Sequence, residues 1–313
     1  MRGAPCECRG TSREKGSLEG CQAIRDAPPL SVGPLAARWD AVADECRRRH
    51  TCYVKIAEEV LVAADQNMVS AWRAVLAAFP IPGDVHDDDV VLLSSGVPVP
   101  LFNPAFVTRP PADAEATVTR VVDHYASLGA PFVLDFRDEV AFGLADACAA
   151  AGLVEHWRPA LMVLDPIPPT IAQVPPDLEV SRVTTDSLDD YSGVLSAGFG
   201  MPRELADLVS GPWLFSGTAS KGLIGMVRGE PTGSAAVFVS EGVAGIYNIA
   251  TVPPGRGKGV GAAMTWAAVR AGQEAGATCA ILQSSEQGEP VYGRMGFATP
   301  TRYRQFQPAG APS

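Results

Sequence analysis

Apolar and polar residues follow a regular pattern along the second half of the chain. Alternating positions and helical spacing predict, in order, a strand, two short helices, a three-stranded antiparallel meander, a long helix, a strand, a short helix and a last strand. These elements are expected at 178–183, about 186–197, about 202–210, 223–227, 234–239, 246–252, about 259–274, 278–283, about 288–295 and about 301–306. Turn sequences at Gly229–Gly233 and Glu241–Gly242 separate the strands of the meander. The fold class is therefore α+β.

The first half repeats part of this order. In each half an aromatic-asparagine pair is followed by a Pro-Pro pair, a helical segment that ends at a glycine, and a short strand. The corresponding positions are Phe102-Asn103 and Tyr247-Asn248, Pro110-Pro111 and Pro253-Pro254, Gly129 and Gly276, and Phe132–Asp135 and Cys279–Leu282. The similar spacings indicate an internal repeat, with chance similarity as the alternative.

A proline-rich stretch divides the two halves. Asp165–Asp177 holds five prolines in thirteen residues, which favours an extended linker. We therefore predict a domain at 34–165, a linker at 166–177 and a second domain at 178–313, and 313 residues suffice for two domains. Residues 1–33 are rich in Gly, Pro, Arg and Glu without apolar periodicity, and we expect a flexible tail there.

Composition narrows the choice of partners. The net charge is −10 and the isoelectric point is about 4.9, which argues against nucleic acid or an anionic membrane as a partner. A cationic or neutral small substrate fits better. No apolar run approaches the roughly 20 residues of a membrane helix, and the N-terminal residues lack an apolar signal core, so we expect a cytoplasmic protein. The sequence does not indicate an oligomeric state.

Metal sites and disulfides are not expected. The seven cysteines show no paired C-x-x-C spacing, and only Cys6 and Cys8, in the predicted tail, are a minor metal candidate. In His86–Asp89, three consecutive carboxylates of an extended chain cannot all face one ion. They directly precede the predicted strand at Val90–Leu93, so a charged turn is the better interpretation.

The stretch Val252–Met264 carries the strongest chemical signal. It reads VPPGRGKGVGAAM, so four glycines and two cations lie between a predicted strand and a predicted helix. This order gathers free backbone N–H groups and the positive end of a helix dipole at one spot, which binds anions. The alternative is a surface turn with solvated cations. The first half has Ala112–Thr117 instead, with two carboxylates and no glycine, so we expect no such anion there.

The spacing of the glycines distinguishes between the known phosphate-binding motifs. A Walker loop does not match, because Lys258 is followed by Gly259. A dinucleotide fingerprint ending at Ala262 is weak, because no acidic residue closes the next strand at Leu282-Gln283. The remaining reading, an R-x-x-G-x-G sequence at Arg256–Gly261, resembles the acyl-CoA pyrophosphate loop of the GNAT superfamily of N-acetyltransferases.

A second motif extends the resemblance. Ser285 followed by Tyr292–Phe297, a tyrosine-bearing helix closed by Gly-Phe, resembles the family's second signature. The resemblance covers about 178–307, and the repeat implies that 34–165 is a degenerate second copy, as in tandem members. The implied fold is a pair of GNAT-like domains, each with a mixed, mostly antiparallel sheet flanked by helices.

The resemblance also implies a cofactor and its binding residues. Acetyl-CoA would be the acetyl donor, with its pantetheine arm beside Asn248–Val252, where Ala250 and Val252 are the expected backbone partners. The pyrophosphate would lie at 256–262. The implied cofactor-binding residues are Asn248, Ala250, Thr251, Val252, Arg256, Gly257, Lys258, Gly259, Val260, Gly261, Ala262 and Ser285. Ser284–Gln287 also reads as a capping box, which gives Ser285 a structural alternative.

The catalytic groups are only partly implied. Tyr292 would protonate the leaving CoA thiolate, with a packed core tyrosine as the alternative. The central strand carries Tyr247 and Asn248 rather than a carboxylate, so the general base stays open between a water chain, Glu286 and an acid of the segment 186–215. We expect that segment to wall the acceptor site, with solvated amphipathic helices as the alternative. Its candidate residues are Asp189, Asp190, Glu204, Asp207, Trp213 and Phe215.

The predicted function is an acetyl-CoA-dependent N-acetyltransferase acting on a primary amine of a small molecule or peptide by direct attack on the thioester. The alternative is a non-catalytic acyl-CoA-binding or sensing module. In either case we expect one cofactor per chain, in the second half.

Overall fold

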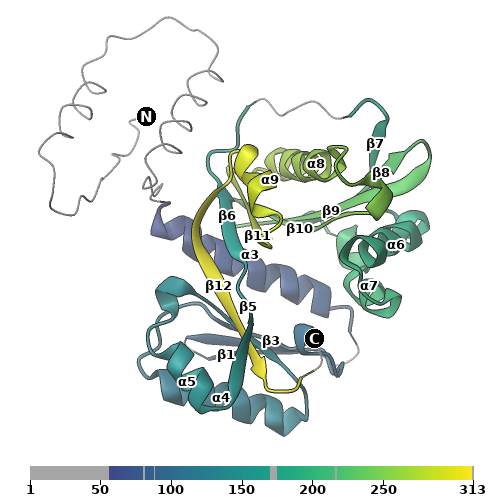
Figure 1. Ribbon diagram of the computed structural model, residues 1–313. Helices are drawn as coiled ribbons and strands as arrows, with labels where there is room; N and C mark the ends of the chain where they lie inside the picture. Colours follow the sequence, from purple (N-terminus) through teal and green to yellow (C-terminus); the bar gives the residue numbers. More distant parts are fainter. Residues whose placement is uncertain (1–55, 80–81, 88, 170–174, 216, 312–313) are drawn as a thin grey trace, which may run out of the picture. The chain divides into compact units, whose positions relative to one another are not determined.

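The computed structural model describes residues 56–79, 82–87, 89–169, 175–215 and 217–311. They lie in one compact unit, Ile56–Ser313 (Figure 1). The tail predicted at 1–33, with Cys6 and Cys8, and the beginning of the domain predicted at 34–165 lie outside the described residues.

From Leu178 onward, the helices and strands follow the order that the sequence pattern predicts. The α-helices are α3 (Glu58–Leu76), α4 (Ala114–Leu128), α5 (Leu144–Ala150), α6 (Leu188–Phe199), α7 (Arg203–Val209), α8 (Val260–Glu274) and α9 (Glu289–Arg294). The strands are β1 (Gly83–Asp87), β2 (Val90–Ser94), β3 (Pro104–Val107), β4 (Val133–Arg137), β5 (Leu153–Trp157), β6 (Ala160–Leu164), β7 (Leu178–Arg182), β8 (Ser220–Val227), β9 (Glu230–Ser240), β10 (Val243–Thr251), β11 (Cys279–Ser284) and β12 (Ala298–Pro308). The α+β class is confirmed.

The strands form one continuous path of hydrogen-bonded neighbours. Its order is β1-β2-β3-β4-β12-β6-β11-β10-β9-β8-β7, and β5 pairs with β12 beside this path. Two neighbouring pairs, β3 with β4 and β10 with β11, are parallel, and the other pairs are antiparallel. The sheet is therefore mixed and mostly antiparallel, as predicted.

The two halves of the chain exchange strands. β6 precedes the proline-rich stretch in the sequence, yet it lies between β11 and β12, with Ala160 opposite Ser284 and Arg302. The last strand, β12, pairs with β6 over Ala298–Arg302 and then with β4 and β5 from Tyr303 onward. These two sets of partners explain why β12 is longer than the strand expected at about 301–306.

Helices cover both faces of the sheet. α8 packs on one face of β8, β9 and β10, where Met264 and Val269 belong to the core, and α9 contacts β6 (Figure 1). α6 and α7 cover the other face near β8, β9 and β10. α3, from the first half, crosses the middle of the unit, and its Leu61 and Met68 share a core cluster with Ile281 of β11 (Figure 1). A helix of the first half is thus part of the core of the second half.

The turns of the meander are tight. Ser240 pairs with Val243, so Glu241 and Gly242 form a two-residue turn with positive φ, as predicted. The turn expected at Gly229–Gly233 is wrong: Val227 pairs with Glu230, and Arg228 and Gly229 alone make the turn, both at positive φ. Pro231 had argued for a longer turn. It is accommodated within β9 because the β8–β9 register shifts opposite it, between Gly225 and Met226.

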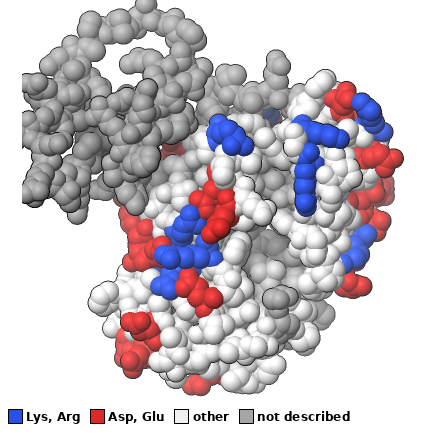
Figure 2. Space-filling view, in the orientation of Figure 1, with Lys and Arg blue, Asp and Glu red and all other residues white. Residues whose placement is uncertain are grey.

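The described surface mixes charges of both signs. On the face drawn in Figure 2, acidic and basic side chains lie close together over the middle of the unit, without a continuous basic area. Asp87, at the end of β1, and Asp89, just before β2, both pair with Arg120. No described helix is long and apolar enough to cross a membrane. Within the described ranges, no three His, Cys, Asp or Glu side chains are placed to hold a metal.

Candidate active site

β10 and β11 separate in the middle of the sheet. They pair in parallel only from Val243 to Gly245, opposite Cys279–Ile281. Beyond this point β10 keeps β9 as its neighbour, and β11 keeps β6. A cavity of about 10 Å³ lies where the strands part, and it is lined by Ala64, Met68, Leu161, Tyr247, Ile281, Leu282, Gln283 and Tyr303.

A β-bulge interrupts β10 at the same place. The β9–β10 register shifts between Tyr247 and Ala250, and Asn248 has a φ of 53°. Asparagine tolerates this left-handed conformation better than most residues, which explains why it occupies the bulge. Its carbonyl accepts a hydrogen bond from Ser234 Oγ at 2.9 Å, whereas its buried Nδ2 has no partner. Bulges of this kind redirect backbone groups next to active sites.

The bulge determines which backbone groups leave the sheet. Val252 N donates to Thr232 O of the preceding strand at 3.0 Å. Because hydrogen-bonded pairs alternate along an antiparallel ladder, Ala250 also faces β9, and the N–H of Thr251 points the other way. The N–H groups of Ala250 and Val252, the expected backbone partners, thus face β9, whereas the Thr251 N–H lies on the side where β10 has no strand neighbour.

The glycine loop leads from β10 into α8. A single 3₁₀ turn, η5 (Pro253–Gly255), is followed by Gly257 and Gly259 with φ of 72° and 80°. Gly259 is the N-cap of α8 and provides no side-chain hydrogen bond. The first N–H groups of a helix have no intrahelical partners, so the amides around Val260 and Gly261 lie at an uncapped, positive helix end. This geometry suits an anion.

The two cations of the loop differ in their surroundings. Arg256 Nη2 donates to Gly198 O at 2.7 Å and Arg256 Nε to Thr251 O at 3.3 Å, so its guanidinium ties the loop to the end of α6. Lys258 lies on the exposed part of the loop. Arg256 therefore holds the loop in place in addition to contributing charge.

The second motif lies beside α8. Tyr292 of α9 packs in the core cluster of α8, with its ring 6.0 Å from that of Phe297. Burial raises the pKa of its phenol, and the Thr265 side chain partly opposes the rise. The phenol is protonated at neutral pH, as a general acid must be, and the raised pKa makes it a weaker acid than an exposed tyrosine. Both the packing and the acid role expected for Tyr292 are compatible with this position.

Ser285 does not cap α9. The helix begins at Glu289, its N-cap Gly288 makes no side-chain hydrogen bond, and Ser285 contributes only its carbonyl, which accepts from the N–H groups of Gly288 and Glu289. The capping-box alternative is therefore wrong. The exposed Ser285 side chain follows directly after β11, at the end that has separated from β10.

Two of the four acids expected to wall the acceptor site bind a cation instead. Asp189 and Asp207 both bind the guanidinium of Arg203, and Ser192 also donates to Asp207. Asp190, Glu204 and Glu286 are exposed side chains. Trp213 is buried and donates its indole N–H to Val209 O at 2.9 Å, whereas Phe215 is partly exposed. None of these carboxylates lines the cavity between β10 and β11.

Helix α3 brings polar side chains that the sequence analysis did not assign. The fully buried Asn67 donates to Phe238 O and Val243 O at 3.1 Å and accepts from the Tyr247 hydroxyl at 2.8 Å. Two residues earlier on the same helix, Asp65 accepts from Tyr303 and Arg137. The only available signal was the polar run Asp65-Gln66-Asn67 within a mainly apolar helix, and nothing in the sequence tells which strands that helix covers.

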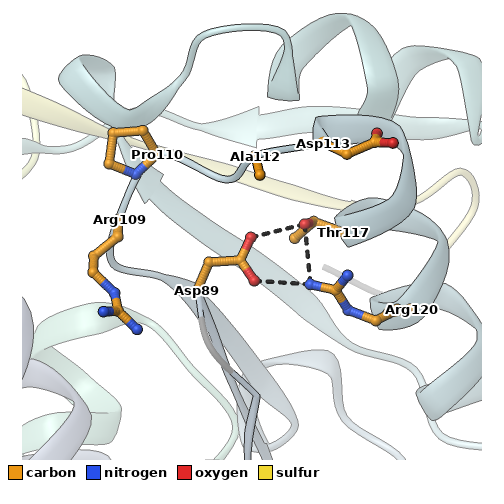
Figure 3. A pocket seen from close by; sticks show the side chains of 7 residues that line it. All are labelled: Asp89, Arg109, Pro110, Ala112, Asp113, Thr117 and Arg120. Carbon is orange, nitrogen blue, oxygen red and sulfur yellow. Dashed lines mark hydrogen bonds and ion pairs between the residues drawn. The ribbon is translucent and has the colours of Figure 1, made fainter.

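The first half lacks this arrangement at the corresponding place. β3 and β4 stay paired from Pro104 to Val107, without a bulge. The N-cap of α4 is Asp113, whose side chain accepts from Ala116 N at 3.0 Å. A pocket of about 400 Å³ lies here, lined by Asp89, Arg109, Pro110, Ala112, Asp113, Thr117 and Arg120 (Figure 3). Asp89 accepts from Thr117 and Arg120, both at 2.8 Å, so these charges compensate one another.

Comparison with known proteins agrees with this geometry. Residues 189–297, which include the bulge, the glycine loop and Tyr292, match the family model described as Acetyltransferase (GNAT) family. The chain therefore contains a GNAT acetyltransferase domain. This match makes the protein an acyltransferase, with acetyl-CoA as the donor that the family generally uses. A comparison with curated proteins found no match.

Solved structures resemble most of the unit that carries the GNAT domain. A GCN5-related N-acetyltransferase from Kribbella flavida is 18% identical, with a TM-score of 0.63 over 78% of this chain and 95% of that one. A tandem GNAT protein from the clavulanic acid biosynthesis pathway is 14% identical, with a TM-score of 0.53 over 79% of this chain and 88% of that one. These likenesses show that the fold reaches beyond the GNAT segment into the first half.

Proposed function

We propose that this protein is a cytoplasmic N-acetyltransferase that transfers the acetyl group of acetyl-CoA to a primary amine of a small molecule or peptide by direct attack on the thioester. The observation that carries the proposal is the combination of an uncapped helix end at Gly259 with a bulged strand that has left its neighbour just before it. Acetyl-CoA is an intracellular metabolite, which is why the proposal includes a cytoplasmic location.

The residues present fit the donor. The backbone N–H groups of 257–262 and the charge of Lys258 would hold the pyrophosphate, because glycines at 257, 259 and 261 leave the main chain open to an anion. Asn248 to Val252 would lie along the pantetheine arm, and Ser285 would contact the cofactor from the end of β11. When bound, acetyl-CoA supplies the activated acyl group. Arg256 contributes charge while its hydrogen bonds to Gly198 O and Thr251 O fix the loop.

The chain's own groups would supply the catalysis. The N–H of Thr251, which points away from β9, would donate to the carbonyl oxygen of the acyl group, and one fixed donor of this kind contributes about 3 to 4 kcal/mol to transition-state stabilisation. The phenol of Tyr292 would give its proton to the departing thiolate. The phenol is protonated at neutral pH, as this role requires, although its raised pKa makes it a weaker acid than an exposed tyrosine.

The first half is proposed to be a degenerate GNAT-like copy that serves as a scaffold. Within 34–165, the described residues repeat the order of strand, loop, helix and strand, but Asp113 caps the helix where the second half has an open end. The linker at 166–177 would join the copies. Isothermal titration of the full chain with CoA should therefore give a stoichiometry near one, and two equivalent sites would contradict the scaffold role.

The decisive test is acyl transfer itself. Purified protein is incubated with acetyl-CoA and a panel of amines covering alkyl amines, amino acids and peptide N-termini, while free thiol is followed. Thiol release that requires both protein and one class of amine, with the acetylated amine identified by mass, is the expected result. Saturable CoA binding without transfer to any amine would instead indicate a binding or sensing module.

A further inference from the structure

A buried polar cluster joins both halves of the chain beneath the cavity between β10 and β11. Asp65 of α3 is 3% exposed, Arg137 of β4 is 1% exposed and Tyr303 of β12 is 2% exposed. Asp65 accepts from Tyr303 Oη at 2.6 Å and from Arg137 Nε at 2.8 Å. Two strands that are distant from α3 in the sequence thus direct a guanidinium and a hydroxyl at the Asp65 carboxylate.

Two tyrosine hydroxyls connect the cavity to α3, and they lead to different partners. Tyr247 and Tyr303 both line the cavity. Tyr247 donates to the amide oxygen of Asn67, which cannot take up a proton, whereas Tyr303 donates to the carboxylate of Asp65. Of the groups reached from this cavity through one hydrogen bond, Asp65 is therefore the proton acceptor. The volume of about 10 Å³ leaves room for about one water molecule.

We propose that Asp65, acting through Tyr303, accepts the proton that the attacking amine loses during acetyl transfer. The inference rests on the proposed function and fills the role that no carboxylate of the central strand provides. As the amine nitrogen bonds to the acyl carbon, its proton passes by way of a water in the cavity to Tyr303 Oη, while the Tyr303 hydroxyl proton moves to Asp65 Oδ1. The thiolate leaves with the electron pair of the broken carbon–sulfur bond. Asp65 is a positioning residue by this route, since Tyr303 lies between it and the reacting atoms.

The surroundings of Asp65 favour such a role. Burial raises its pKa to about 6, and this rise is opposed by the charge of Arg137 and by the hydrogen bonds from Tyr303 and Arg137. Glu58 of α3 adds to the rise, while Glu139 faces the same guanidinium at 3.3 Å. Tyr247 is the remaining titratable neighbour of Tyr303. An acceptor whose pKa lies near the working pH takes and returns a proton readily. Asp65 must be ionised to act, so acetyl transfer should increase as pH rises through this pKa.

The expected consequence is a specific kinetic defect. Asp65→Asn keeps the size of the side chain but cannot accept the proton, and Tyr303→Phe removes the connecting hydroxyl while leaving the Asp65–Arg137 pair. Each variant should lower kcat for amine acetylation by about 10² to 10⁴, the usual contribution of general acid–base catalysis. The KM for acetyl-CoA and the affinity for CoA by titration should stay within about twofold, and the rise in kcat near pH 6 should disappear.

Asp135→Asn is the matched control. Asp135 is also a buried carboxylate, 5% exposed, but it accepts hydrogen bonds from Gln305 Nε2, at 2.9 and 3.0 Å, and it does not line the cavity. This variant should keep the wild-type pH profile. If Asp65→Asn does not fold, as judged by its thermal unfolding, Tyr303→Phe decides the question.

Two negative results have different meanings. In one case the wild-type enzyme is active and the folded Tyr303→Phe variant keeps both the wild-type kcat and the rise in kcat near pH 6. This result would overturn the relay alone. A wild-type protein that binds CoA but acetylates no amine would overturn the proposed function, and the relay with it. A parallel loss in the Asp135→Asn control would also count against the relay, because it would make the defect a general effect of buried carboxylates.

Discussion

At the scale of single residues, anion binding by the glycine loop depends on the absence of a side chain at Gly259. This residue combines a φ of 80° with the N-cap position of α8, and a Cβ added to it would meet only Pro175 Cγ at 3.7 Å. Space alone would therefore admit a side chain, and backbone conformation would favour glycine, asparagine or aspartate. Among these, only glycine and asparagine avoid a negative charge beside the amides of 257–262.

The first prediction compares Gly259→Asp with Gly259→Asn. The two side chains have nearly the same shape and tolerate positive φ, so they differ mainly in charge. The Asp variant should bind CoA more weakly than the Asn variant by about 1 to 3 kcal/mol, because a carboxylate would repel the pyrophosphate near the surface. Isothermal titration measures both, with thermal unfolding as the control for folding. Equal affinities in two folded variants would remove the pyrophosphate from this loop.

A second residue-scale prediction concerns Asp135. Burial raises the pKa of its carboxyl to about 7, and the hydrogen bond from Gln305 only partly opposes this rise. The folded state therefore keeps the proton up to a higher pH than the unfolded state, whose pKa is about 3.9. Between these two values the native state binds more protons, so this group makes the free energy of unfolding fall as pH rises.

Asp135→Asn should remove that fall, because an amide does not titrate. The stability of the variant relative to wild type should increase by on the order of 1 kcal/mol per pH unit between about pH 4 and pH 7. Urea unfolding at several pH values measures the difference. Asp123→Asn, which removes an exposed carboxylate of α4, controls for the loss of one negative charge. A constant difference between Asp135→Asn and wild type across this range would contradict the expectation.

At the scale of elements, α3 shows how one buried amide can hold a helix on a sheet. Asn67 donates to the carbonyls of Phe238 and Val243 and to Ser240 Oγ, all at 3.1 Å. These acceptors lie at the end of β9 and the start of β10, on both sides of the turn that joins them. The helix is thereby fixed in register against the strand that carries the bulge.

The third prediction is that Asn67→Ala destabilises the protein by about 2 to 4 kcal/mol. The substitution leaves buried carbonyls and the Tyr247 hydroxyl without a partner, and each such group costs about 1 to 3 kcal/mol. Gln66→Ala is the matched control, since Gln66 is the exposed neighbour on the same helix, and it should change stability by less than about 0.5 kcal/mol. Equal effects of the two substitutions in chemical unfolding would show that the amide does not hold the helix.

The sequence predicted elements well where their local pattern is strong. α8 and β11 lie within one residue of the expected ranges, because apolar spacing and the flanking glycines mark both ends. β9 was misjudged because Pro231 suggested a turn, whereas the register shift opposite it admits proline within the strand. For the site, the glycine loop could be found from spacing alone. The partners of Tyr247 and Tyr303 could not, because Asn67 and Asp65 reach them through contacts between residues about 180 and 240 positions apart.

At the scale of the whole molecule, the exchange of β6 and the end of β12 makes the two halves depend on each other. All five residues of β6 are buried, and they fill the position between β11 and β12. Burying each of its larger apolar side chains contributes roughly 1.5 to 3 kcal/mol. A piece of chain that starts after the linker would lack this strand, and β11 would expose an unpaired edge next to the site. The strands on each side of the linker therefore do not form separate sheets.

The last prediction follows from this exchange. A protease site inserted at 170–174 allows the folded full chain to be cut between β6 and β7. The two pieces should stay together on size exclusion and bind CoA with the affinity of the uncut protein, because the cut breaks no strand pairing. The C-terminal piece produced alone should bind CoA at least tenfold more weakly or aggregate, since β6 is absent. Pieces that separate after cutting under native conditions, with the C-terminal piece retaining full affinity, would show that the second half is complete without the strand it borrows.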